Sequence, residues 1–112
     1  MSRSTLAVLR RSGLCLALLA LPFAAGSAAA AGQYTVTLSQ MRYGAVPAGL
    51  HVGDVIAFVN KDTVPHTVTA RDHSFNLQVA PGKSASLRLT KTGTFSFYCV
   101  LHPAMRGTLK VS

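Results

Sequence analysis

Three side chains that bind soft metal ions lie within seven residues near the C-terminus, in the spacing Cys99-x2-His102-x2-Met105. A thiolate, an imidazole and a thioether together suit copper that changes between its two oxidation states, with a short thiolate bond and a weak axial thioether. A fourth donor is needed, and His66 lies more than 30 residues upstream of Cys99. Any fold of this chain must therefore bring two distant segments together, and the pattern predicts a blue-copper site with these four ligands.

Short strands account for most of the remaining chain. Residues 34–38 and 84–89 alternate apolar and polar side chains, which is the period of a half-buried strand, and residues 55–59 form an apolar run of buried-strand length. Further short strands are predicted at 50–52, 66–70, 75–79, 94–99 and 107–111. Gly and Pro turn residues separate these segments, and no window shows a helical pattern. The sequence therefore predicts an all-β sandwich or barrel.

The first 31 residues are predicted to be a cleavable secretory signal peptide. Residues 1–11 carry three arginines and no acid, residues 13–25 are apolar, and residues 26–31 are the small residues that a signal peptidase accepts. An apolar run of about 13 residues is shorter than the roughly 20 that span a bilayer, so we expect cleavage rather than a membrane anchor. The mature domain is predicted at residues 32–112, exported to the periplasm and not membrane-spanning. The export route stays open.

Charge and cysteine content restrict the possible partners of the mature segment. Residues 32–112 contain eight Lys or Arg, three Asp and no Glu, a net charge of +5, and one cysteine, Cys99. One cysteine allows no internal disulfide, which is unusual in a small exported protein, and a lone thiol there needs a metal or a core to protect it. The basic residues are scattered singly, which argues against nucleic-acid binding. A mild positive field instead favours encounter with an acidic protein.

The ligand residues also have ordinary structural interpretations. The two-residue period of a strand puts Phe95, Phe97 and Cys99 on one apolar face, so Cys99 taken alone would be an inert buried thiol. Met105 taken alone would be core filler, and His66 a surface or core histidine. Their combined spacing outweighs these interpretations, because it supplies the complete donor set of one copper site.

Three stretches of the chain resemble the cupredoxins, most closely the amicyanins and more distantly the plastocyanins. They are residues 53–60, Pro65-His66 and residues 98–107. The order Cys-x2-His-Pro-x-Met-Arg-Gly in the last stretch is similar to the short ligand loop of the amicyanins, and residues 41–43 resemble their Met-Lys-Tyr segment. The resemblance extends over about residues 35–111, which is nearly the whole mature segment.

The resemblance implies an eight-stranded Greek-key β-sandwich with one copper ion at one pole, and one-electron transfer rather than enzyme catalysis. The residues that it implies are His66, Cys99 and His102 as equatorial ligands, Met105 as the axial ligand, and Asn60 and Thr67 as supporting residues beside them. Thr67 stands where the family usually has an Asn whose amide braces the ligand loop. The metal and the fold are expected to survive this change.

In the family, the edge of the C-terminal histidine ligand reaches solvent through an apolar patch that faces the redox partner. Here the resemblance implies a patch around His102 that is formed by Met41, Arg42, Pro65, Pro103 and Ala104. The implied partners are redox proteins, a periplasmic dehydrogenase or a cytochrome c, that meet a monomer. Residues 100–101 and 104 depart from the family pattern, so the identity of the partner stays open.

Two other classes of function fit the sequence less well. A periplasmic copper-binding or delivery protein without redox turnover would prefer an exposed, exchangeable site and more donors than the two methionines of residues 32–112, Met41 and Met105. An enzyme would need an open metal site, for which His51 and His73 are the spare histidines. We therefore expect an electron carrier, with copper delivery as the alternative.

Overall fold

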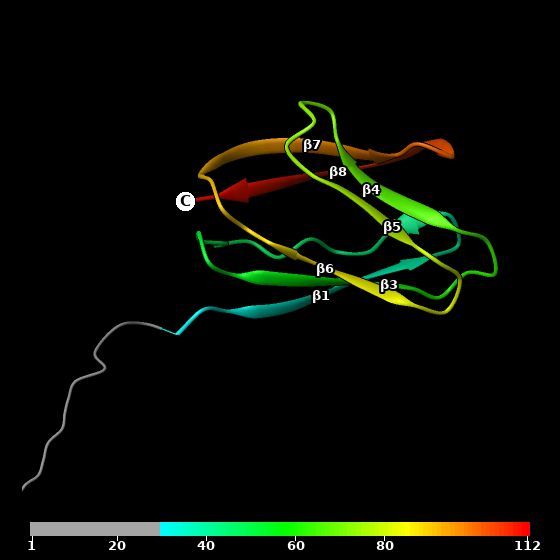
Figure 1. Cartoon of the computed structure of the whole chain (residues 1–112), viewed down its shortest axis with the longest axis horizontal. Coiled ribbons are helices and arrows are strands. Elements are labelled where there is room, and N and C mark those ends of the chain that lie inside the picture. Colours follow the sequence, from blue (N-terminus) through cyan, green and yellow to red (C-terminus); the bar gives the residue numbers. More distant parts are fainter. Residues whose placement is uncertain (1–29) are drawn as a thin grey trace, which may run out of the picture. The chain divides into compact units, whose positions relative to one another are not determined.

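Residues 30–112, the part of the chain that this computed structural model describes, fold into eight β-strands in two sheets (Figure 1). The strands are β1 (Gln33–Ser39), β2 (Arg42–Tyr43), β3 (Val55–Asn60), β4 (His66–Ala70), β5 (Asn76–Val79), β6 (Ser84–Arg88), β7 (Gly93–Cys99) and β8 (His102–Val111). One sheet has the order β2-β1-β3-β6 and the other β5-β4-β7-β8. The predicted eight-stranded Greek-key sandwich is confirmed.

The signal peptide at the N-terminus stays a prediction, because residues 1–29 lie outside the described residues. Within residues 30–112, no helix is long and apolar enough to cross a membrane.

Alternating side chains of the two sheets form the core. On β3 the buried residues are Ile56, Phe58 and Asn60, and on β7 they are Phe97 and Cys99. The predicted apolar face of β7 is confirmed, because Phe97 and Cys99 are fully buried and the next residue of that row, at position 95, is half-buried. The row of core side chains therefore ends in the sulfur of Cys99, at one end of the sandwich.

Phe97 occupies the centre of this core. Its ring meets those of Tyr43 and Phe58 edge to face, with centroid distances of 4.8 Å and 6.2 Å. Gly107 lies opposite Phe97 on β8, and a Cβ at that position would overlap the Phe97 ring. Glycine is therefore required there by close packing and not by backbone conformation.

Strand boundaries follow the predicted ones except in three places. β4 covers residues 66–70 as predicted. The ends of β1, β3, β5, β6 and β7 each lie within one residue of the predicted ends. The predicted strand at 50–52 is wrong, since Leu50 makes only an isolated bridge to Val111. β2 was not predicted from periodicity, and β8 begins at His102 rather than at Gly107. Leu50 has a partner that is distant in sequence, whereas Arg42 pairs with Ser39 and His102 with Cys99, across turns of two residues.

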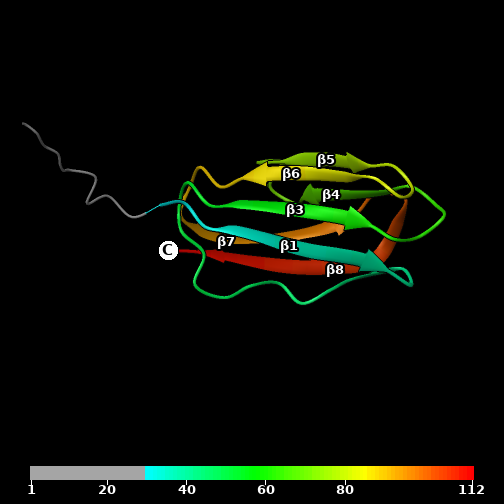
Figure 2. The same ribbon diagram turned by 90° about the horizontal axis from the view of Figure 1, so that it is seen from below.

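Strand order brings the candidate ligand segments to one end of the sandwich. β4 and β7 are antiparallel neighbours, so the start of β4 lies beside the end of β7. Both views place the β3–β4 loop and the β7–β8 turn at the same end, on the right-hand side (Figures 1 and 2). The segment between β2 and Leu50 runs along the β1 and β8 side, where the amide of Ser112 donates to the Leu50 carbonyl (Figure 2). That edge of the sandwich is thereby covered.

Candidate metal centre

Three of the four predicted ligand side chains converge where β4 begins and β7 ends. Sγ of Cys99 lies 3.8 Å from Nδ1 of His66 and 3.6 Å from Nδ1 of His102. The three donor atoms all lie within 4.8 Å of one another, and no second group of this kind occurs in the described part of the chain. His51 and His73, the spare histidines, are exposed and outside the cluster. The cluster is compact enough for its donors to share one ion.

Burial differs between the two histidines of the cluster. His66 is 1% exposed and Cys99 is fully buried, whereas His102 is half-buried. The difference follows from position, because His66 is the first residue of an inner strand and His102 follows the exposed turn at Val100 and Leu101. One imidazole is therefore shielded by protein, while the other has an edge near solvent.

A two-residue turn links Cys99 to His102. β7 ends at Cys99, Val100 and Leu101 form the turn, and β8 begins at His102 directly opposite Cys99. The side chains of Val100 and Leu101 are 49% and 54% exposed. The order of ligands resembled a short loop, but the structure assigns the residues from His102 onward to β8.

β8 then bulges before regular pairing resumes. After the pair of residues 99 and 102, Tyr98 pairs with Arg106, so Pro103, Ala104 and Met105 have no partner on β7. Proline has no amide hydrogen to donate to a ladder, and such bulges re-aim side chains. Pro103 and Ala104 are exposed, whereas Met105 is 3% exposed and belongs to the core cluster that includes Cys99. The bulge therefore turns the Met105 thioether inward.

Asp62 is a residue of the site that the sequence reasoning missed. Its Oδ2 lies 2.8 Å from Nε2 of His66, and because a carboxylate accepts, Nε2 must donate. The neutral ring then carries its lone pair on Nδ1, the atom that faces Cys99. Hydrogen bonds from His66 and, next, from the Met41 amide hold the pKa of Asp62 below its ordinary value. The spacing Asp-x3-His was the available signal, since metal-binding histidines commonly donate to a carboxylate.

Asp62 also fixes the turn between β1 and β2. Its two oxygens accept the amides of Gln40 and Met41 at 2.8 Å and 3.0 Å. Both turn residues have positive φ, 54° and 61°, a conformation that costs non-glycine residues about 1–2 kcal/mol each. The Asp62 carboxylate offsets that cost, so one side chain connects the turn that carries Met41 with the ring of His66.

Thr67 supports the opposite side of the cluster through both its backbone and its side chain. Its amide donates to Sγ of Cys99 at 3.3 Å, and its Oγ1 accepts the amide of Val100 at 2.9 Å. The hydroxyl of Thr69 donates to Thr67 Oγ1 or to Asn76 Oδ1, at 2.9 Å and 2.8 Å. A threonine hydroxyl therefore makes the contact to the turn for which the family pattern uses an asparagine amide.

Asn60 shapes the loop that precedes His66. Its Nδ2 donates to the carbonyls of Val64 and Val79, at 2.8 Å and 3.0 Å, and its Oδ1 accepts the amide of Asp62 at 2.9 Å. Both amide hydrogens and the carbonyl oxygen of this buried side chain therefore have partners, as burial requires. Asn60 thereby sets the path of the chain into both Asp62 and His66.

Tyr43 attaches β2 to the same site. Its hydroxyl donates to the carbonyl of Thr67, and its ring packs on Phe97. Burial, followed by the negative charge of a nearby Cys99 thiolate, raises the pKa of Tyr43 far above its ordinary value. The phenol is therefore a neutral hydrogen-bond donor at every working pH.

The surface next to His102 is apolar over a wider area than the resemblance implied. Pro65, Pro103 and Ala104 are exposed, and Met41 is 41% exposed. Arg42, the fifth residue of the predicted patch, is also exposed. Three further exposed residues, Val64, Val100 and Leu101, were not in the predicted patch. A hollow of about 530 Å³ beside the site is lined in part by Pro65, Val100 and Leu101. The sequence feature that could have predicted this wider apolar surface is the pair of bulky apolar residues between Cys99 and His102.

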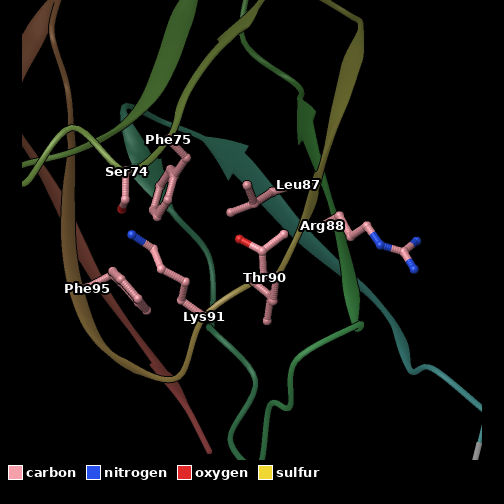
Figure 3. Close-up of a pocket in the computed structure, with 8 residues that line it drawn as sticks. Ser74, Phe75, Leu87, Arg88, Thr90, Lys91 and Phe95 are labelled. Carbon is pink, nitrogen blue, oxygen red and sulfur yellow. The ribbon is translucent and has the colours of Figure 1, made fainter.

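A smaller pocket lies where β6 ends and where β5 and β7 begin (Figure 3). Its apolar wall is formed by Phe75, Leu87 and Phe95, with the amine of Lys91 beside Ser74. The free space is about 30 Å³, which is enough to hold a water molecule. None of its lining residues is a histidine, cysteine or acid, so this pocket offers no metal site.

Comparison with known proteins gives one consistent set of relatives. A sequence model described as "Cupredoxin-like domain" matches residues 13–111. Amicyanin of Paracoccus denitrificans is 30% identical over 96 residues, which cover 80% of this chain and 72% of that protein. The oxidised state of a proline-to-alanine mutant of amicyanin superposes with a TM-score of 0.62 and 28% identity, over 72% of this chain and 83% of the other. The reduced Cu(I) form at pH 4 of a proline-to-glycine mutant of amicyanin gives 0.62 and 30%, over 82% and 92%.

Proposed function

This chain belongs to the cupredoxin-like family, and we propose that it is a type 1 copper protein that carries single electrons between redox proteins in the periplasm. The observation that supports this most directly is the convergence of His66, Cys99 and His102 at one end of the sandwich. Two imidazoles and a thiolate in contact distance of one another are the donors of a blue-copper site.

The donor set fits copper better than it fits other common metals. We propose that Nδ1 of His66, Sγ of Cys99 and Nδ1 of His102 would hold the ion strongly, with the thioether of Met105 as a weak fourth ligand. Methionine is a poor ligand for zinc, and hard cations prefer oxygen donors. When bound, copper supplies a one-electron redox couple. The single cysteine of the mature segment is then a copper ligand, and the metal protects its thiol from oxidation in an oxidising compartment.

The chain keeps the proposed ligands in place through contacts that do not involve a metal. Asp62 fixes the ring of His66, and the Thr67 amide contacts the sulfur of Cys99. The Thr67 hydroxyl fixes the turn that leads to His102. Side chains fixed in this way change position little between two oxidation states, and a small rearrangement lowers the barrier to electron transfer.

Burial of the cluster favours an electron carrier over the other classes of function. His66, Cys99 and Met105 are at most 3% exposed, so protein excludes water from most of the site. A delivery protein needs a site from which the metal exchanges, and an enzyme needs an open position for substrate. The half-buried ring of His102 provides an edge for electrons but little room for either process.

We propose that electrons leave through His102 and the apolar surface around it. This docking patch comprises Met41, Arg42, Pro65, Pro103 and Ala104, extended by Val100 and Leu101. An acidic redox protein, a dehydrogenase or a cytochrome c, would meet this surface on a monomer, attracted by the net charge of +5 of residues 32–112. Introducing a charge by Ala104→Glu should weaken transfer to the partner and leave the colour of the copper protein unchanged.

The decisive experiment is the optical spectrum of the copper(II) protein. An intense thiolate-to-copper charge-transfer band in the red should be present, and Cys99→Ser should abolish it while copper(II) can still bind the histidines. Ser96→Ala, on the outward face of the same strand, is the matched control and should keep the band. A colourless copper(II) protein, or a band that survives in Cys99→Ser, would refute the assignment.

Export is tested separately from metal binding. If residues 1–31 are a signal peptide, the protein recovered from the periplasm should begin at or within a residue or two of Gly32, as determined by N-terminal sequencing. Recovery of the uncut chain from the cytoplasm would contradict the proposed location.

A further inference from the structure

Gly32, the residue that follows the predicted cleavage point, lies against the carboxylate of Asp54. Gly32 directly precedes β1 and Asp54 directly precedes β3. These two strands pair in parallel, with Gln33 beside Val55, so the residues before them are also neighbours. The Gly32 nitrogen donates to Oδ1 of Asp54 at 2.7 Å, and the Gly32 carbonyl accepts the Val55 amide at 2.9 Å. Both polar backbone groups of Gly32 therefore have fixed partners.

Asp54 is a buried carboxylate that has no ion-pair partner within residues 30–112. It is 5% exposed, and the one ion pair of that range joins Asp62 to His66. The amides of Gly32 and His51 hold the pKa of Asp54 below its ordinary value, and the His51 imidazole adds a smaller effect. The carboxylate is therefore charged at neutral pH. Buried charges in proteins are normally paired, so Asp54 lacks the cation that its burial calls for.

We propose that the mature chain begins at Gly32 and that its new α-ammonium group forms an ion pair with Asp54. Hydrolysis by the peptidase breaks the peptide bond between residues 31 and 32. Water supplies the oxygen of the new carboxylate on Ala31 and the two protons that convert the Gly32 N–H into –NH₃⁺. The Gly32 nitrogen is already in hydrogen-bond contact with Oδ1 of Asp54, so the pair needs no rearrangement. This inference rests on the proposed export for the cleavage, but the ion pair itself does not depend on copper.

The contacts of Gly32 favour a cut after Ala31 over a cut after Ala30. A chain that begins at Ala31 carries its charge on an exposed residue, about 3.8 Å further along the backbone, and keeps a neutral amide against Asp54. Gly32 is half-buried, and a Cβ at this position would lie 2.8 Å from the ring of Tyr34. Glycine thus leaves the room that this ring occupies, and the ring limits the access of water to the pair.

The ion pair would fasten the sandwich at the end opposite the candidate metal centre. Both views place the starts of β1 and β3 at the left-hand end, away from the β7–β8 turn (Figures 1 and 2). The first residues of a domain are poorly ordered unless contacts hold them. β1 lies between β2 and β3, so loosening of its first residues would expose an inner strand. Cleavage at this position therefore stabilises the mature protein relative to its precursor.

The test compares two prepared forms of the chain that differ only in where they begin. Residues 31–112 form one compact unit, so one form begins at Gly32 and the matched control at Ala31, with the same net charge. In urea unfolding of the metal-free protein, the Gly32 form should have a folding constant about fivefold higher. The reason is that a hydrogen bond between charged groups contributes more than one from a neutral amide. Asp54→Asn in both forms should reduce this difference to less than twofold.

Acetylation of the α-amine provides a second measurement that does not require Asp54→Asn to fold. It removes one charge from either form and keeps an amide N–H on the first residue. Reaction near neutral pH in urea selects the α-amine, because its pKa lies well below that of lysine. Acetylation should cancel the advantage of the Gly32 form and should change the folding constant of the Ala31 form less than twofold.

Four results would overturn the inference. Equal urea midpoints for the two forms, or equal effects of acetylation on both, would show that the new charge does not pair with Asp54. A difference that persists in Asp54→Asn would assign the effect to another group. N-terminal sequencing that finds Ala30 or Ala31 first in the exported protein would refute the assigned start. An uncut chain in the cytoplasm would instead contradict the proposed export, and the two prepared forms would still decide whether the ion pair exists.

Discussion

Replacing Thr67 with valine tests the support of the turn between Cys99 and His102. Valine has nearly the shape of threonine, so Thr67→Val removes the hydroxyl without leaving a cavity. The Val100 amide, which donates to Thr67 Oγ1 at 2.9 Å, then loses its partner, whereas the Thr69 hydroxyl can still donate to Asn76.

The expected magnitude follows from the exposure of the groups involved. A buried donor left without a partner costs about 1–3 kcal/mol. The side chain of Val100 is 49% exposed, so water can partly replace the lost contact, and we expect a value of about 1.5 kcal/mol. For a domain of this size that lowers the melting temperature by roughly 6–12 °C.

The assay is urea unfolding of the metal-free protein together with amide hydrogen exchange. In Thr67→Val the free energy of unfolding should fall, and the Val100 amide should lose its protection from exchange. Thr67→Ser is the control, because it keeps the hydroxyl and removes only a methyl group, so Val100 should stay protected even if stability declines. An unchanged Val100 amide and unchanged stability in Thr67→Val would refute the claim that this hydroxyl fixes the turn.

Three further predictions concern the stability of the fold. Copper that binds only the native state should raise the melting temperature, by the equivalent of about 4 kcal/mol at a thousandfold excess over its Kd, and calorimetry showing equal melting with copper bound would contradict this. Gly107→Ala should destabilise the domain by about 1–3 kcal/mol in urea, since the new Cβ overlaps the Phe97 ring, and an unchanged urea midpoint would show that the ring moves freely. Amides of Gly32 and His51 lower the pKa of Asp54, so its contribution to stability is present above about pH 4 and is lost as the pH falls through the lowered value. Asp54→Asn should therefore flatten part of the acid decline in melting temperature, and an identical pH profile would exclude Asp54 as a contributor.

Local sequence patterns predicted most of the strands because each pattern depends on a few neighbouring residues. The alternation of residues 34–38 and 84–89 and the apolar run of 55–59 became β1, β6 and β3 with nearly the predicted boundaries. The two-residue β2 has no periodicity to detect. Its position depends on the turn at Gln40 and Met41, both of which have positive φ. The carboxylate of Asp62, which is distant in sequence, stabilises that turn by accepting both amides.

The β7–β8 connection shows a feature that the local sequence did not predict. The resemblance implied a short ligand loop here, but the structure places the residues after 101 in the bulged strand β8. A bulge depends on how the strand is aligned with its partner strand, and the sequence of the bulged segment alone does not specify that alignment. The inward direction of Met105 and the exposure of Pro103 both follow from that register.

The sequence alone determined the chemistry of the candidate site, because donor type and short-range spacing are properties of individual side chains. Cys99, His102 and Met105 could be singled out in that way, with His66 added as the missing donor. The tertiary structure decided which atoms meet: Nδ1 rather than Nε2 of His66 faces the sulfur because Asp62 binds the other nitrogen. It also decided that Gly32 and Asp54 meet, since β1 and β3 become neighbours only in the folded sheet. Contacts between residues far apart in sequence arise from the packing of whole strands, and no local pattern records them.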